Sequence, residues 1–121
     1  MNQKTLDLFG KILIQRIRDE AIEEWYDILN GKKKGVTAKK IQKLLTSFDE
    51  DQLDVLRQII PEIVDTTLHY LLWTLEQENS INVFVEINGE MNSNIRDVSD
   101  GLAGELYSED GWIAKYSKHP L

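Results

Sequence analysis

The segment from Pro61 to Asn79, PEIVDTTLHYLLWTLEQEN, decides how the rest of the chain must fold. On a helical wheel at about 100° per residue, apolar positions cover roughly half of its circumference. These positions are Ile63, Val64, Thr67, Leu68, Leu71, Leu72 and Leu75. Pro61 suits a first turn, where its missing N–H has no intrahelical partner in any case. The pattern therefore predicts a central helix that begins at Pro61 and is covered by the rest of the domain.

A narrow polar strip remains on the far side of this helix and consists of Glu62, Asp65, His69 and Glu76, with Trp73 beside it. Asp65 and His69 have the i, i+4 spacing at which a carboxylate can orient an imidazole. This pair is the catalytic hypothesis, with Glu105 as a further candidate carboxylate. The alternative is a structural polar pair or an exposed strip. Without an HExxH motif or a second histidine nearby, the sequence predicts no metal site and no cofactor.

Upstream of Pro61 the sequence predicts three more helices. From Thr5 to Asn30, apolar residues recur every three or four positions and form a wide stripe, and the following Gly31 is a stop signal. The width of this stripe indicates that the first helix touches more than one neighbour. A short second helix is expected to begin with Thr37 as its cap.

The third predicted helix begins near Ser47 and Glu50, which have the spacing of a capping box. Its expected buried face consists of Leu53, Leu56, Ile59 and Ile60. Pro61 is expected to break or kink the chain after this face, because proline in a helix interior removes a hydrogen bond.

After Ser80 the periodicity changes from helical to alternating. Apolar residues occupy every second position from Ile81 to Ile87, which predicts a strand, and Asn88-Gly89 favours a tight hairpin turn. The partner of this strand is either the segment 91–98 or the same strand of a second subunit, which would make a homodimer through 81–87. Ser108 is expected to cap a last helical turn, and the tail from Ser117 is expected to be loose.

The predicted fold class is mainly α: a compact bundle of about four helices with a small C-terminal strand or β-hairpin. We expect one domain over residues 1–121, with a helical core at 5–79 and a C-terminal segment at 80–121. The sequence leaves open whether 90–107 is helix or loop.

Composition limits the environment of the protein. The 121 residues include no cysteine, which excludes disulfides and thiolate metal sites and fits a reducing cytosol. Asp7 and Lys11 interrupt the only apolar run that resembles a signal peptide, and no stretch approaches the roughly 20 apolar residues that span a bilayer. We therefore expect a cytoplasmic protein without membrane contact.

Charge is distributed unevenly over a net value of −7. Residues 31–43 contain six lysines and no acid, whereas residues 44–121 contain 15 acids and 4 basic residues. An acidic body repels phosphate backbones, so we expect no nucleic-acid partner. A basic protein partner or simple solubility explains the acidic excess, and the lysines are interpreted as a solvated face.

The segment from Asp97 to Trp112 combines five carboxylates, three glycines and two aromatic residues. Glycine-containing loops of this kind often line binding sites. The predicted binding residues are Asp97, Asp100, Glu105, Glu109, Trp112 and Trp73. An EF-hand loop with Gly101 as its sixth residue fails, because Arg96 and Val98 would fall at ligand positions.

Two functions from different classes follow. The first is a protein-binding or regulatory module, for example an inhibitor of a basic partner, and this class is favoured because signatures such as a Walker loop, a GxSxG elbow or a cysteine nucleophile are missing. The second is a hydrolase or metal-dependent enzyme that uses Asp65, His69 and the carboxylates of 97–110. The sequence identifies neither the partner nor the oligomeric state, nor whether a reaction occurs at all.

Overall fold

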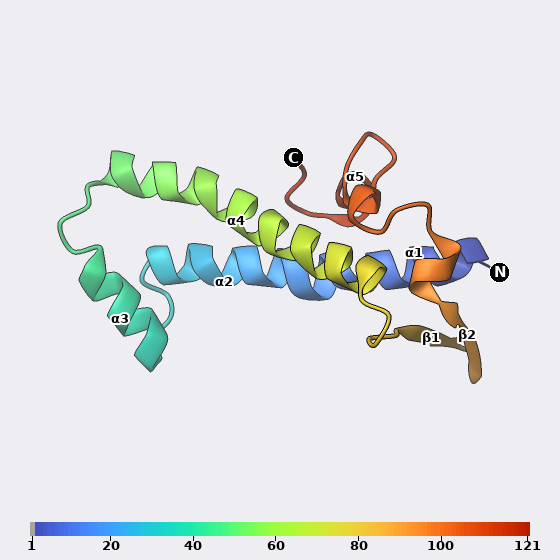
Figure 1. The fold of residues 1–121 in the computed structure, drawn as a ribbon. Coiled ribbons are helices and arrows are strands. Elements are labelled where there is room, and N and C mark those ends of the chain that lie inside the picture. The colour runs from blue at the N-terminus through green and yellow to red at the C-terminus, as the bar shows by residue number, and fades with distance from the viewer. Residues whose placement is uncertain (1) are drawn as a thin grey trace.

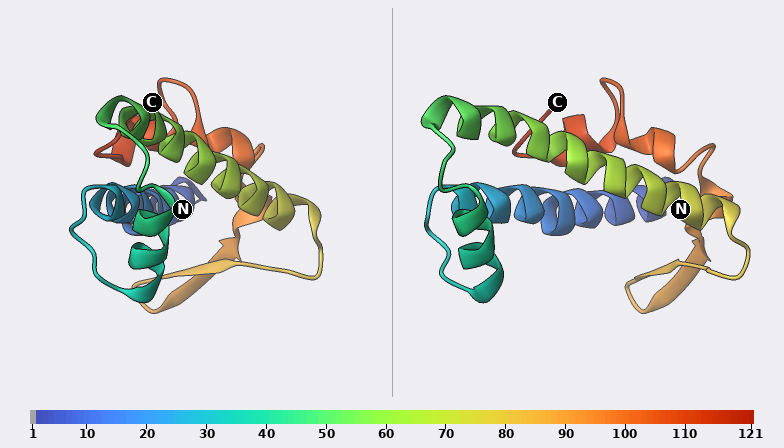
Figure 2. Two further views of the ribbon diagram at one scale, coloured as in Figure 1. Left: turned by 90° about the vertical axis from the view of Figure 1, so that its left-hand side faces the viewer. Right: turned by 60° about the vertical axis from the view of Figure 1, so that its left-hand side comes forward.

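The computed structural model describes residues 2–121 and confirms a mainly helical fold with a small hairpin. Two long antiparallel helical segments form its frame (Figure 1). The C-terminal segment lies along one side of this pair, whereas a short helix and the hairpin lie on the other side, near its two ends (Figures 1 and 2).

The first long helix runs without interruption through α1 (Asn2–Ile12), a π-helical segment (Leu13–Arg18) and α2 (Asp19–Leu29). In a π-helix the hydrogen bonds join residues five apart instead of four. Buried residues follow that spacing: Leu13 and Ile14 are buried, and so are Arg18 and Asp19 five positions later. The helix ends as predicted, with Gly31 at a positive φ of 75°.

Helix α3 (Val36–Leu44) is short, and Gly35 at its N-cap provides no side-chain hydrogen bond. The expected cap at Thr37 is therefore wrong, since Thr37 already lies inside the helix. Helix α4 (Glu50–Gln77) begins with a capping box two residues later than predicted. Asp49 Oδ1 accepts a hydrogen bond from the Gln52 amide at 2.8 Å, and Gln52 Oε1 accepts one from the Asp49 amide at 2.9 Å.

Pro61 does not end a helix, because α4 continues through it as one 28-residue helix. A proline at this position leaves the carbonyl of Arg57, four residues earlier, without its usual backbone donor. The hydroxyl of Tyr26 on α2 donates to that carbonyl at 3.1 Å. A side chain from the neighbouring helix thus replaces the missing backbone bond, a compensation that local sequence rules do not reveal.

Strands β1 (Phe84–Ile87) and β2 (Glu90–Asn94) form the antiparallel hairpin. Its turn is the predicted Asn88-Gly89, with φ values of 53° and 82°, as a type I′ turn requires. Because β1 pairs with β2 of the same chain, the unpaired strand that motivated a dimer through 81–87 does not exist.

The C-terminal segment contains 3₁₀ turns at Ile95–Val98 and Ala103–Leu106 and a short helix α5 (Trp112–Tyr116). Gly111, not the expected Ser108, occupies the N-cap of α5. The hydrophobic core joins this segment to one side of the long helices, and its members include Leu13, Ile14, Leu68, Leu72, Leu75, Ile95, Leu102, Leu106, Trp112 and Ile113.

Helix α4 is not covered all round. Leu68, Leu72 and Leu75 are buried as predicted, but Ile63, Thr67 and Leu71 are exposed. In its first half only Ile60 of the predicted face is buried, whereas Ile59 is exposed and Leu53 and Leu56 are half-buried. The predicted apolar face is therefore split, with one part in the core and the other in solvent.

Candidate functional site

The predicted catalytic carboxylate, Asp65, lies in a buried ion pair. Its exposed fraction is 4%, and that of its partner Arg18 is 0%. Arg18 Nε donates to Asp65 Oδ1 at 2.5 Å and Nη2 donates to Oδ2 at 3.2 Å, which is the two-pronged geometry of a strong guanidinium–carboxylate contact. Asp65 pairs with a residue of the first helix and not with His69.

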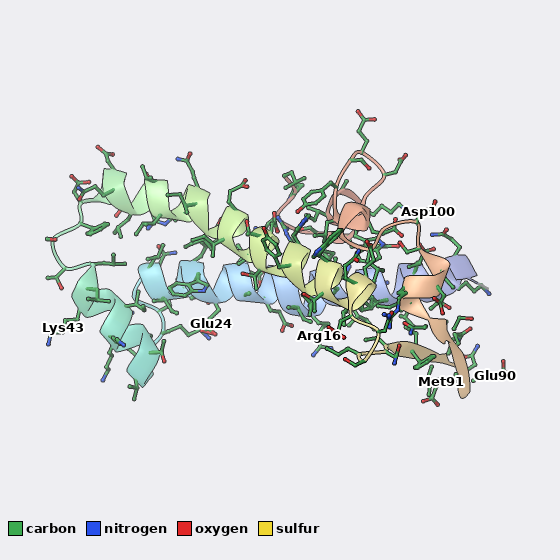
Figure 3. All side chains as sticks on the ribbon, in the orientation of Figure 1. Arg16, Glu24, Lys43, Glu90, Met91 and Asp100 are labelled. Atoms are coloured by element: carbon green, nitrogen blue, oxygen red, sulfur yellow. The ribbon has the colours of Figure 1, made fainter. Side chains whose placement is uncertain are left out.

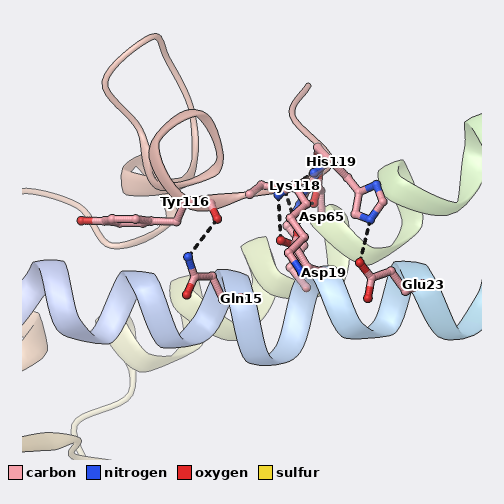
Figure 4. Close-up of polar contacts among 9 residues, drawn as sticks. Gln15, Asp19, Glu23, Asp65, Tyr116, Lys118 and His119 are labelled. Carbon is pink, nitrogen blue, oxygen red and sulfur yellow. Dashed lines mark hydrogen bonds and ion pairs between the residues drawn. The ribbon is translucent and has the colours of Figure 1, made fainter.

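The C-terminal tail completes this buried cluster (Figure 4). Arg18 Nη1 donates at 2.7 Å to both Ser117 Oγ and the His119 carbonyl, and Ser117 Oγ donates to Asp19 Oδ1 at 2.6 Å. The Lys118 amide donates to Asp19 Oδ2 at 2.8 Å, and the His119 ring lies 3.3 Å from Glu23 Oε1. The tail is thus bound to the first helix, which corrects the expectation of a loose end.

Every buried side-chain nitrogen and oxygen in the described residues has a hydrogen-bond partner. Satisfied networks of this kind stabilise a single arrangement of the chain. Asp65 is closed off from solvent and occupied on both oxygens, so the geometry gives it a structural role and does not present it to a substrate.

His69, the other half of the predicted pair, contacts Tyr107 from the C-terminal segment, with 3.2 Å between Nδ1 and the phenol oxygen. Burial raises the pKa of Tyr107, and the negative charges of Asp65 and Glu62 raise it further. A phenol that is harder to ionise keeps its proton, so the contact between the Tyr107 hydroxyl and His69 Nδ1 is a hydrogen bond without an ionised phenolate. Glu76 is another carboxylate of the predicted polar strip, and its Oε1 accepts a hydrogen bond from the Leu102 amide at 2.6 Å.

The acidic residues of 97–110 do not converge on one point. Asp97, Asp100 and Glu109 are exposed, and Glu105 accepts a hydrogen bond from Ser99 at 3.3 Å. Asp100 projects from the C-terminal segment far from the hairpin tip (Figure 3). Within residues 2–121 no group of three or more His, Asp or Glu is arranged to hold a metal ion.

The two tryptophans predicted to bind a partner differ in environment. Trp73 is 47% exposed on α4. Trp112 is buried, with its ring 5.9 Å from that of Phe9 in an edge-to-face contact, so its assignment to a binding surface was wrong. Gly10 makes this packing possible, because a Cβ there would lie 2.4 Å from the Trp112 ring.

The strongest candidate site is a group of exposed apolar residues from the long helices and β1, which includes the walls of two hollows and which we call the groove. We define the groove by Ile12, Ile17, Trp25, Ile63, Leu71 and Phe84, whose exposed fractions lie between 36% and 59%. At its hairpin end, a hollow of about 300 Å³ is lined by Ile12, Ile17 and Phe84 among others. At its other end, a smaller hollow of about 110 Å³ lies between Trp25 on α2 and Ile60, Ile63 and Val64 on α4.

Helical spacing extends the apolar residues of the groove along each long helix. Trp25 follows Ile17 by eight residues with Ala21 midway, and Leu71 follows Ile63 by eight with Thr67 midway, so each set lies along one side of its helix. The first helix and α4 are antiparallel, so the order of residues along one set is reversed along the other (Figure 1). The groove therefore has an apolar wall on each long helix.

Charges beside the groove are few and largely paired. Arg16 pairs with Glu20 at 3.4 Å, and Lys33 pairs with Glu24 at 3.5 Å. Arg16 and Glu24 project from the side of the long helix that faces away from the C-terminal segment (Figure 3). Glu86, which lines the hairpin end, belongs to no ion pair among the described residues. Lys43 projects from the outer end of α3, away from the groove.

Sequence patterns assigned the groove residues of the two long helices to apolar stripes, because an amphipathic stripe does not show which of its members find a partner. The one feature of the sequence that could have indicated an exposed apolar surface was the unusual width of the apolar stripe on the first helix.

Comparison with protein-family models, with curated proteins and with solved structures finds no match to this chain. No helix in residues 2–121 is long and apolar enough to cross a membrane.

Proposed function

We propose that the protein is a cytoplasmic protein-binding module whose groove holds an apolar segment of a basic protein. The observation that carries this proposal is the exposure of six large apolar side chains from the first helix, α4 and β1, five of which line two hollows. Contiguous exposed apolar surface is rare on monomers and marks sites of interaction.

Aromatic enrichment and scarce charge support the same proposal. Trp25 and Phe84 are residue types that protein interfaces favour, whereas free charges are depleted at the centre of interfaces. In the groove, the neighbouring charges of the first helix are already neutralised by ion pairs. A partner that covers them does not bury an isolated charge.

The expected sign of the partner's net charge follows from the net charge of this chain. The protein carries −7 overall, and Glu86 beside the groove forms no ion pair within residues 2–121. A basic partner gains from long-range attraction during encounter, and this gain falls as salt is added. An inhibitor of a basic enzyme or toxin is one form of such a module, and the absence of cysteine fits the cytoplasm.

The hydrolytic alternative gains no support from the geometry. Asp65 is buried against Arg18, and His69 contacts a tyrosine instead of a carboxylate. We therefore propose no catalytic function.

Affinity capture from native cytosol, with mass spectrometry of the eluate, tests the proposal. We expect a stoichiometric basic protein that binds the wild-type chain at low salt and less at high salt. The double variant Ile17→Glu, Phe84→Glu places two charges in the groove and should lose this protein.

The matched control is Met91→Glu, because Met91 is exposed on the same hairpin but does not line the groove. It should keep the partner, and titration calorimetry with the purified partner should show the same ranking. Equal capture by the wild type and the groove variant, or capture of no basic protein, would contradict the proposal.

A further inference from the structure

The outer side of α4 carries a second apolar surface, separate from the groove except at Ile63. We name it the seam and define it by Leu56, Ile59, Ile63, Thr66, Tyr70 and Trp73. The intervals between these residues are three, four, three, four and three. This is the heptad spacing with which helices pack side by side in coiled coils.

The seam faces solvent. Tyr70 is 62% exposed, Ile63 59%, Trp73 47% and Ile59 42%, while Leu56 is half-buried. None of the six residues is charged. In the right-hand view of Figure 2, α4 lies at the front and no other element crosses it. A heptad pattern on a helix that already has a separate core side indicates a further helical partner.

We propose that the seam pairs with the seam of a second copy of this chain, with the two α4 helices antiparallel. In an antiparallel coiled coil, the a positions of one helix face the d positions of the other. The register in which residue i lies opposite residue 129 − i sets Leu56 against Trp73, Ile59 against Tyr70, and Ile63 against Thr66. The two-fold axis repeats each contact.

This register uses nearly all of α4, since it places Gln52 opposite Gln77 within a helix that spans Glu50–Gln77. Each layer combines an aliphatic residue with an aromatic or small one, so apolar surface is matched along the whole seam. Because both partners contribute the same face, the contact closes as a dimer and does not propagate.

Polar groups beside the seam are self-complementary in this arrangement. Glu62 and His69 occupy the flanking g positions, and antiparallel packing brings Glu62 of one copy beside His69 of the other. The Tyr107 hydroxyl occupies His69 Nδ1 at 3.2 Å, so Nε2 is the ring nitrogen that can meet that carboxylate, to which it donates when it carries a proton. In a parallel arrangement Glu62 would face Thr67 instead of His69.

Light scattering coupled to gel filtration tests the dimer on the full chain. We expect twice the 14.0 kDa mass of the single chain. The variant Tyr70→Glu, Trp73→Glu should halve the measured mass, because each copy would then press two glutamates against Ile59 and Leu56 of the other copy. Both residues are exposed, so circular dichroism should report an unchanged fold. The control Phe84→Glu, Met91→Glu carries the same added charge on the hairpin and should remain dimeric.

The absence of cysteine allows a clean test of orientation. Ile59→Cys and Tyr70→Cys chains of different tag length are mixed and oxidised. Antiparallel packing predicts disulfides that join an Ile59→Cys chain to a Tyr70→Cys chain, whereas parallel packing predicts disulfides within each species. A monomer at all concentrations, a dimer that survives the seam variant, or disulfides only within each species would overturn the proposal.

Discussion

The two sides of the long helix pair differ in a way that apolar content does not explain. The side covered by the C-terminal segment carries three polar residues of α4 that have specific partners: Asp65 binds Arg18, His69 contacts Tyr107, and Glu76 accepts a hydrogen bond from the Leu102 amide. The bare side carries Ile63 and Leu71. Directional bonds, added to the burial of Leu68 and Leu72, distinguish the side that the chain itself covers. Apolar residues without such bonds remain open to another molecule.

The largest expected effect concerns the covered side. Arg18→Met leaves Asp65 and Asp19 buried without their cation, and removing one partner of a buried pair costs about 3–5 kcal/mol. Urea denaturation followed by circular dichroism measures the loss. The control is Arg16→Met, which removes an exposed ion pair with Glu20 and should cost under about 1 kcal/mol. Similar losses for both variants would mean that the buried cluster does not hold the tail.

A smaller effect is expected where Trp112 packs against the first helix. Gly10→Ala raises helix propensity, but its new methyl group would overlap the indole. Overpacking of this kind typically costs about 1–3 kcal/mol, so thermal and urea unfolding should show net destabilisation. Gly104→Ala is the matched control, because a Cβ at Gly104 meets no atom within 4 Å. Equal stability of Gly10→Ala and wild type would show that Trp112 is not seated as described.

The bond from Tyr26 to the Arg57 carbonyl should contribute about 0.5–1.5 kcal/mol. Tyr26→Phe removes it and leaves that carbonyl without a donor. In a Pro61→Ala background the backbone amide gained at position 61 can donate to Arg57, so the same tyrosine substitution should cost less. A double-mutant cycle in urea measures the difference. Additive losses would indicate that the tyrosine does not compensate for the proline.

The smallest effect is expected on the bare side. Leu71→Ala should change the free energy of unfolding by no more than about 0.5 kcal/mol, because exposed sites tolerate truncation. Its neighbour Leu72 is fully buried, and Leu72→Ala should cost about 2–5 kcal/mol. Urea titration of the pair therefore compares the two sides of α4 one residue apart. A large loss at Leu71 would mean that the groove belongs to the core.

Local signals predicted much of the fold. The Asn30-Gly31 stop, the Asn88-Gly89 turn and the helical repeat before residue 78 act over a few residues, and the structure contains all of them. The predictions that failed depended on distant contacts. Pro61 is tolerated because Tyr26 lies beside it, and the tail is ordered because Arg18 and Asp19 bind it. The predicted site failed for the same reason, since Asp65 found a partner 47 positions away.

By itself, the sequence determined the helical class, the hairpin, the acidic charge and the absence of thiol chemistry, because period, turn residues and composition act locally or by simple summation. Only the tertiary structure decided which half of each amphipathic stripe is buried. A helical wheel identifies apolar positions but not their neighbours, and the C-terminal segment covers one side through long-range ion pairs and hydrogen bonds. Ile17, Trp25, Ile63 and Tyr70 are exposed because no segment of the described chain reaches them.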